Sequence, residues 1–281
     1  MKVIYSILAT LLLAACSEQQ TATPDTAASV AESAASSSAA SETATQQAQL
    51  EKVKIGLIAS PTGNAPLNFV DEKGQMQGFE YDVLQEIAKR AGYSFEYEYQ
   101  AREQLFDQFK EDKFKLLAGS ISLTDERKNT FVMSNPYLDA YPVTLLSKDA
   151  SIKKLTDIKA KSIVALKDSP MDTNYQILND FKGAEDKISL ELTKSDWLSV
   201  QSMLANKATV AISNSTVIPY YYTNSNSKEV PLYFSIDYDY PQEHYGFIIN
   251  KDDKKLLENV NKYLAEMKAD GTYQTLYKKW F

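Results

Sequence analysis

Residues 81–99 read YDVLQEIAKRAGYSFEYEY, and their hydrophobic period changes at Gly92. Before this glycine, apolar side chains recur at helical spacing, at Val83, Leu84, Ile87, Ala88 and Ala91. After it, aromatic residues alternate with polar ones, at Phe95, Tyr97 and Tyr99. A glycine at the junction is typical of a helix end. The stretch therefore predicts a helix followed at once by a strand.

Similar patterns lie on both sides of this stretch. Alternating apolar residues at 53–57 predict a strand before the helix, and an apolar run at 116–118 predicts another after a short helix at 105–109. The order strand, helix, strand, helix, strand predicts an α/β fold, in which helices cover both faces of a mostly parallel sheet.

A second α/β set follows residue 141. Strands are predicted at 162–166, 188–192 and 210–212, with helices at 171–181 and 196–205. Two such sets predict two lobes, and ligands of open parallel sheets gather where loops leave the carboxyl ends of the strands. The pattern is typical of a two-lobed binding protein or enzyme and does not choose between them.

The first 50 residues have a different character. Met1 and Lys2 precede a short apolar run at 7–13, as in an export signal. The sequence LAAC that ends at Cys16 resembles the bacterial lipobox, and the alternative is an ordinary apolar signal that happens to contain a cysteine. Residues 1–16 are therefore predicted to be a lipoprotein signal peptide with lipidated Cys16. Residues 17–50, rich in Ala, Ser, Thr and Gln, are predicted to be a flexible linker.

Composition argues against several functions. The net charge of -7, with 30 basic and 37 acidic residues and no basic block, argues against a nucleic-acid partner. One histidine and one cysteine give no ligand cluster for zinc or copper. We therefore expect no metal and no cofactor.

Separated segments between Val53 and Phe281 resemble a known family. They are GFEYDVL at 78–84, GSISLTDER at 119–127, LTDIKAK at 155–161, EHYGF at 243–247 and KADGTY at 268–273. In these segments the chain resembles the amino-acid branch of the bacterial extracellular solute-binding proteins, family 3. The acids of the first segment also suit the start of a helix.

The resemblance implies a type II periplasmic-binding-protein-like fold with a hinged cleft. Lobe 1 is expected at 51–140 and 243–281, and lobe 2 at 141–242. The implied function is capture of a polar amino acid and delivery to an ABC permease, by a monomer anchored through lipid on the periplasmic side of a bacterial membrane or at the cell surface. The alternatives are a same-fold dehydratase acting on a cyclic acid and a surface lipoprotein used for adhesion or interaction. We find no convincing nucleophile and base pair, so a non-catalytic role is expected.

The resemblance also implies a ligand site. Arg127 is expected to bind the ligand's α-carboxylate, because a guanidinium can give two parallel hydrogen bonds to one carboxylate. Gly119, Ser120 and Ser122 are expected to complete this shell. The other interpretation of Arg127 is a solvated helix-start residue that pairs with a neighbouring acid.

Other candidate residues come from positions around these motifs. Ser169 either touches ligand or caps a helix that starts at Pro170. Arg102 either lines the side-chain pocket or lies on the surface. Asn64 stands in a segment where the family has aromatic residues. Asn214 replaces the family's usual Asp, which pairs with the ligand's ammonium, so another acid is needed or the ligand's amine is modified, absent or solvated.

Overall fold

The computed structural model describes residues 50–58, 64–100, 102–158, 162–167 and 189–281. The predicted signal peptide and all but Leu50 of the predicted linker lie outside these ranges, as does the helix predicted at 171–181. The strands of the described residues form two larger sheets and one hairpin, made by β2 (Phe69–Val70) and β3 (Met76–Gln77).

The first sheet has the strand order β4-β1-β5-β13-β6, with β7 also paired to β13. Its strands are β1 (Glu51–Ile58), β4 (Tyr93–Gln100), β5 (Leu116–Ser122), β6 (Val132–Met133), β7 (Leu138–Ala140) and β13 (Glu243–Ile249). β1 runs parallel to β4 and β5, whereas β13 runs antiparallel to β5, β6 and β7. The predicted parallel strands are present, and the returning strand β13 makes the sheet mixed.

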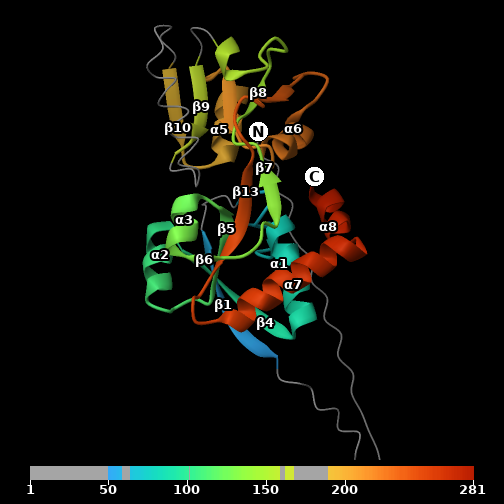
Figure 1. The fold of residues 1–281 in the computed structure, drawn as a ribbon. Helices are drawn as coiled ribbons and strands as arrows, with labels where there is room; N and C mark the ends of the chain where they lie inside the picture. The colour runs from blue at the N-terminus through green and yellow to red at the C-terminus, as the bar shows by residue number, and fades with distance from the viewer. Residues whose placement is uncertain (1–49, 59–63, 101, 159–161, 168–188) are drawn as a thin grey trace, which may run out of the picture. The chain divides into compact units, whose positions relative to one another are not determined.

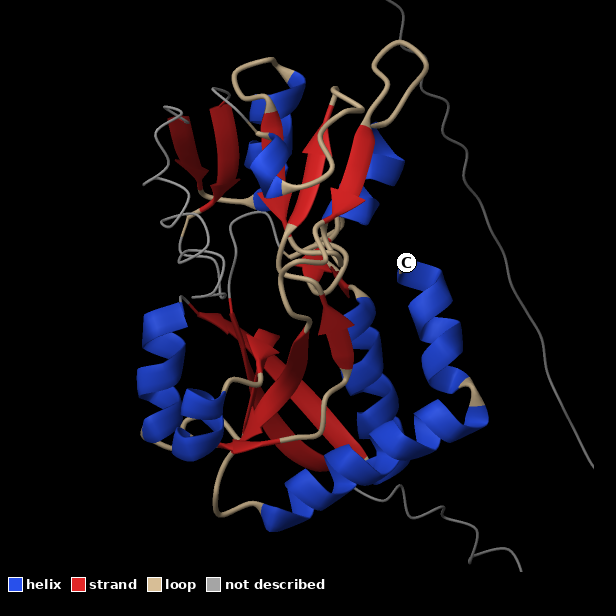
Figure 2. Cartoon of the chain, turned by 45° about the horizontal axis from the view of Figure 1, so that its top comes forward, coloured by secondary structure: helices blue, strands red, loops and turns tan. Residues whose placement is uncertain are grey.

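Helices cover both faces of this sheet. They are α1 (Phe79–Ala91), α2 (Arg102–Lys110), α3 (Asp125–Thr130), α7 (Lys254–Asp270) and α8 (Thr272–Trp280). α1, α7 and α8 pack against one another, and α2 packs against β1 on the side of a separate apolar cluster (Figures 1 and 2). α1 ends as predicted, because Gly92 takes φ 73° and donates its N–H to the carbonyl of Ala88.

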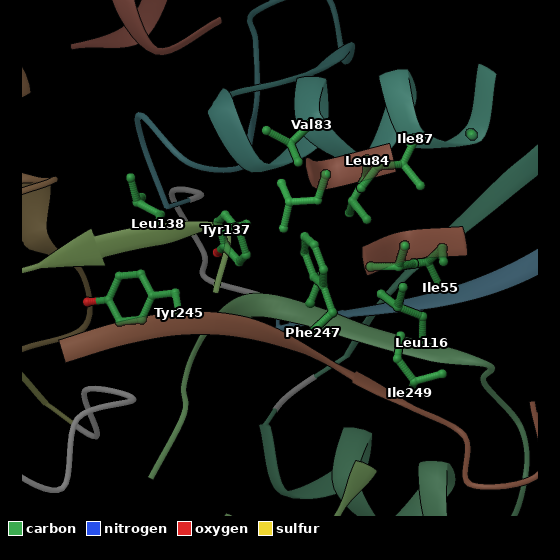
Figure 3. Packing of buried hydrophobic residues seen from close by; sticks show 14 of the residues in the cluster. Ile55, Val83, Leu84, Ile87, Leu116, Tyr137, Leu138, Tyr245, Phe247 and Ile249 are labelled. Atoms are coloured by element: carbon green, nitrogen blue, oxygen red, sulfur yellow. The ribbon is translucent and has the colours of Figure 1, made fainter. Parts of the chain in front are cut away.

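The larger core lies between α1, α7 and the sheet. Figure 3 shows Val83, Leu84 and Ile87 of α1 directed toward β5 and β13. The ring of Tyr137 stacks on Phe247 with centroids 4.5 Å apart. Each fully buried apolar side chain of this kind contributes about 1.5 to 3 kcal/mol, so the periodicity of α1 accounts for much of its docking energy.

The second sheet has the strand order β10-β9-β11-β8-β12. Its strands are β8 (Thr144–Ser147), β9 (Ser162–Leu166), β10 (Ser189–Thr193), β11 (Val210–Ser213) and β12 (Tyr233–Ile236). β9, β10 and β11 are parallel, and β8 is antiparallel to β11 and β12. The helices α5 (Asp196–Leu204) and α6 (Ile218–Ser225) cover one face, and a short 3-10 helix at Leu155–Asp157 contributes to the core on the other.

The carboxyl ends of the parallel strands in both sheets lie at the edges where the chain passes between the sheets. Thr144, the first residue of β8, lies opposite Ser213, the last residue of β11. Tyr245, near the start of β13, lies opposite Ser122, the last residue of β5. The loops that follow β5 and β11 therefore border the two connecting segments, 141–143 and 237–242.

The described residues contain no helix that combines the length and the apolar character needed to cross a bilayer.

Candidate functional site

The end of β5 leaves regular strand geometry at Gly119 and Ser120. Gly119 has φ 124°, and a Cβ atom there would lie 2.7 Å from the Cβ of Ile58 on β1. Ser120 has φ 55°, a left-handed conformation that few residues other than glycine adopt. The sheet therefore requires glycine at 119 and holds a strained residue at 120, as is common where the backbone is positioned for a function.

Glu80 on α1 binds this strained segment. Its Oε1 accepts hydrogen bonds from the backbone N–H groups of Gly119 (3.0 Å) and Ser120 (3.2 Å) and from the hydroxyl of Tyr137 (2.6 Å). Its Oε2 accepts from the side-chain amide of Asn68. Burial raises the pKa of Glu80, and the four donors, Tyr137 first, oppose that rise. Four donors around one buried carboxyl group suit a carboxylate that holds the strand end in place.

Sequence reasoning assigned Glu80 only to the start of a helix. It does lie in the first turn of α1, but it is also fully buried against β5. The available signal was an acid in the apolar surroundings of Phe79 and Val83. Glu80 pairs with Gly119 and Ser120, which lie 39 and 40 positions further along the chain. A contact over this separation has no local sequence pattern.

The structure brings together Asn64 and Ser120, two of the predicted site residues. The Asn64 amide donates to the Ser120 hydroxyl over 2.6 Å. The Asn64 carbonyl accepts the backbone N–H groups of Leu67 (2.7 Å) and Asn68 (3.0 Å), which fixes the turn that carries it. This polar segment therefore packs directly against the end of β5.

Arg127 lies in the first turns of α3, directly after β5. Thr124 caps this helix by accepting the Arg127 N–H at 3.2 Å, and the guanidinium Nη1 donates to the Ser122 carbonyl at 3.0 Å. The Ser122 hydroxyl donates to Glu243 at the start of β13 (3.1 Å). The Oδ1 of the neighbouring acid Asp125 lies 4.0 Å from the Nζ of Lys128. The cap and the carbonyl contact thus place Arg127 and Ser122 side by side at the carboxyl end of β5.

Asn214 lies at the corresponding end of β11 in the second sheet. Its Oδ1 accepts from the Thr216 N–H (2.9 Å), the Thr216 hydroxyl (2.5 Å) and the Val217 N–H (3.1 Å). An amide oxygen has two lone pairs, so three donors leave little capacity for a fourth. Asn214 acts here as a turn cap, and charge for a ligand's ammonium has to come from another group.

The remaining candidates add little to this geometry. Ser169, Cys16 and the side chain of Arg102 lie outside the described residues. His244, the one histidine of the sequence and not a predicted site residue, has its Nδ1 2.7 Å from the Oδ1 of Asp139, and both side chains are about half exposed. Across the described ranges, no three His, Cys, Asp or Glu side chains could together hold a metal ion.

Comparisons with known proteins agree with this architecture. The chain is 27% identical over 220 residues to the amino-acid-binding protein AabA of Dichelobacter nodosus, which covers 77% of this chain and 83% of that protein. It is 22% identical over 231 residues to the ABC transporter arginine-binding protein 1 of Escherichia coli strain K12, covering 82% and 91%.

A similar solved structure is that of the ancestral amino-acid-binding protein AncCDT-1, a precursor of cyclohexadienyl dehydratase. It has a TM-score of 0.68 and 28% identity, covering 82% of this chain and 95% of that one. The match supports the two-lobed type II architecture expected from the sequence. The family model of the bacterial extracellular solute-binding proteins, family 3, matches residues 57–281. Because this match spans most of the chain and includes the segment that carries Arg127, the chain belongs to the bacterial extracellular solute-binding proteins, family 3.

Proposed function

We propose that this protein is the substrate-binding component of an ABC importer and that it captures a polar amino acid between two lobes, residues 51–140 with 243–281 and residues 141–242. The observation that carries the proposal is the position of Arg127, held by the Ser122 carbonyl at the carboxyl end of β5. A guanidinium fixed in this way presents a planar fork that matches a carboxylate.

In this proposal, the first lobe binds the main-chain groups of the ligand. Arg127 takes the α-carboxylate, and the hydroxyls of Ser120 and Ser122 with the backbone near Gly119 complete the shell. Asn64 positions Ser120 through the 2.6 Å hydrogen bond. Glu80 keeps the strained backbone at 119 and 120 in one conformation, so little ordering is left to occur when ligand binds.

The second lobe contributes the opposite side of the proposed site. Ser169 and Asn214 are the proposed contacts there. Arg102, which belongs to the first lobe, is the proposed contact to the ligand side chain. The two lobes close about the connecting segments, where Tyr141 and Ser215 exchange two hydrogen bonds of 2.8 and 2.9 Å. A closed ligand-bound form is the state that an importer can distinguish from the empty one.

The proposal extends to location. Lipidated Cys16 would hold the protein on the periplasmic side of a membrane or at the cell surface, with residues 17–50 as a tether and a monomer as the working form. The lipobox-like LAAC and the family's extracellular character support this. Two or three acyl chains give durable anchoring, whereas one gives only reversible binding.

A same-fold enzyme is the competing function, because a similar structure belongs to a precursor of a dehydratase. The binding role is favoured because the one histidine pairs with Asp139 at a half-exposed position and has no described nucleophile beside it. Conversion of a cyclic acid by the purified protein would favour the enzyme. Saturable binding without product favours the receptor.

The direct test is mass spectrometry of small molecules released from the freshly purified, denatured protein, followed by calorimetry with the compounds found. We expect an amino acid, bound one to one and recovered unchanged. Release of no amino acid, together with no calorimetric response to any standard L-amino acid, would contradict the proposal.

A further inference from the structure

Asp196 occupies the carboxyl edge of the second sheet. It is the first residue of α5, which is capped by Ser195, whose hydroxyl accepts the Leu198 N–H at 3.2 Å. α5 starts after β10 ends at Thr193, and it packs on β9 and β11. The Ser213 hydroxyl, at the end of β11, hydrogen bonds to the Asp196 carboxyl group. Because Ser213 directly precedes Asn214 in the chain, this contact places Asp196 beside the residue next to Asn214.

The carboxyl group of Asp196 could accept more hydrogen bonds than the described residues donate to it. The residue is partly exposed as a whole, but its Oδ1 is buried and has no hydrogen-bond partner among the described residues. Thr144, directly opposite Ser213 on β8, also has a buried hydroxyl without a partner in the same set of residues. Buried polar atoms are normally satisfied. Two unsatisfied atoms at this edge of the sheet, one at the start of α5 and one on β8, therefore indicate a place where a polar group can bind.

The charge of Asp196 is not matched within the described part of the chain. It takes part in none of the ion pairs found there, and no lysine or arginine contributes to its pKa, which burial raises to about 6 despite the Ser213 hydrogen bond. The groups that its charge reaches are the phenols of Tyr221 on α6 and Tyr245 on β13. Tyr220, on α6, adjoins the ring of Tyr221. A buried carboxylate surrounded by neutral groups gains strongly from an incoming cation.

Asp196 lies at the carboxyl edge of the second sheet, and the end of β11 at this edge leads into the loop that carries Asn214. Tyr245, whose pKa Asp196 affects, lies opposite Ser122 in the register of β5 and β13. Ser122 carries the carbonyl that positions Arg127. A zwitterion bound at Arg127 through its carboxylate would need a negative group to pair with its ammonium. Asn214 cannot supply that charge, whereas Asp196 beside the end of β11 can.

We propose that Asp196 binds the positively charged amine of the ligand, in the role that the neutral Asn214 leaves open. This inference rests on the proposed function of the site. It restricts the ligand class to compounds with a free ammonium group beside a carboxylate, and it excludes N-acylated amino acids and amine-free acids as preferred ligands. A purely structural role, in which a buried water joins Asp196 to Thr144, is the competing explanation.

The experiment compares four proteins by calorimetry: the natural chain, Asp196→Asn, Asn214→Asp, and the double variant with both changes. The probes are the standard L-amino acids and their N-acetyl derivatives, at pH 7.5. We expect Asp196→Asn to weaken binding of the preferred free amino acid by at least about thirtyfold. The double variant should recover most of this loss, because it restores one carboxylate at the neighbouring position. A cooperative thermal unfolding transition, measured for each variant, is the control that the variant is folded.

The outcomes separate the two levels of the proposal. If the natural chain binds a free amino acid and Asp196→Asn binds it equally well, the role of Asp196 is wrong while the proposed function stands. A preference of the natural chain for N-acetyl compounds also overturns the inference. If Asp196→Asn unfolds, the test passes to Asn214→Asp. The inference is supported if this variant binds the free amino acid with unchanged affinity and still rejects its N-acetyl derivative. A large gain in affinity for the free amino acid overturns it. No binding of any amino acid by the natural chain contradicts the proposed function and the inference together.

Discussion

At the scale of single residues, Arg127 shows how a charged side chain is prepared for a ligand. Thr124 fixes its backbone and Ser122 accepts one of its guanidinium hydrogens. We predict that Arg127→Ala weakens amino-acid binding by about 2 to 5 kcal/mol, because the ligand carboxylate loses a desolvated partner. Stability of the empty protein should change little. Arg127→Lys is the matched control, which keeps the positive charge without the planar guanidinium. Its affinity, measured by calorimetry, should lie between those of the natural chain and Arg127→Ala. Equal affinity of all three proteins would remove Arg127 from the site.

Asp196 provides a prediction on pH. Burial raises its pKa from 3.8 to about 6, so the folded state holds this proton more tightly than the unfolded chain does. The resulting stability is complete below about pH 4 and is lost as the pH rises through about 6. Asp196→Asn cannot ionise, so it should be more stable than the natural chain by about 2 to 3 kcal/mol at pH 7.5, with little advantage at pH 4. Urea unfolding of both proteins at the two pH values measures this. A variant less stable at pH 7.5 would show that the carboxylate has a structural partner.

At the scale of elements, the end of β5 combines a backbone requirement with a close contact. We predict that Gly119→Ala costs more than about 2 kcal/mol of unfolding free energy, because φ is 124° and the new Cβ would meet Ile58 at 2.7 Å. Gly92→Ala is the matched control. Its φ is 73° and no atom lies within 4 Å of the added Cβ, so only the backbone cost of about 1 kcal/mol applies. Chemical unfolding should rank the variants in this order, and equal losses would contradict a special role for the β5 end.

The elements also show which parts of the fold the sequence predicts. α1 and β4 follow from local periodicity. The buried positions of α1 recur at helical spacing, and the aromatic residues of β4 alternate with polar ones. The short strands β6 and β7 have two and three residues, too few for a period to be detected. Residues 119–127 were predicted as one binding segment, and the structure brings Asn64 to them. Glu80 and Asp196 were missed as members of this region, because their contacts join segments that are distant in the chain and share no local pattern.

At the scale of the whole molecule, attachment and folding should be separable. We predict that Cys16→Ser leaves the thermal unfolding of the mature domain unchanged and moves the protein from the membrane fraction to the soluble fraction. The reason is that the predicted lipid is carried by a residue of the predicted signal region and not by the sheets. Ser17→Ala is the control, which keeps the thiol and should remain with membranes. Retention of Cys16→Ser in the membrane fraction would contradict the predicted anchor.

The position of β13 in the first sheet has a consequence for the order of assembly. This strand comes from residues 243–249 yet lies between β5 and β6, whereas the second sheet is complete within residues 144–236. A chain that is synthesised from its amino terminus can therefore finish its later sheet first, while its earlier sheet waits for residues 243–249. Refolding should show the same order, because closing a loop of more than a hundred residues between β5 and β13 is slow. Pulsed hydrogen exchange would detect protection of β9 and β11 before β5, and simultaneous protection would show that the two sheets form in one step.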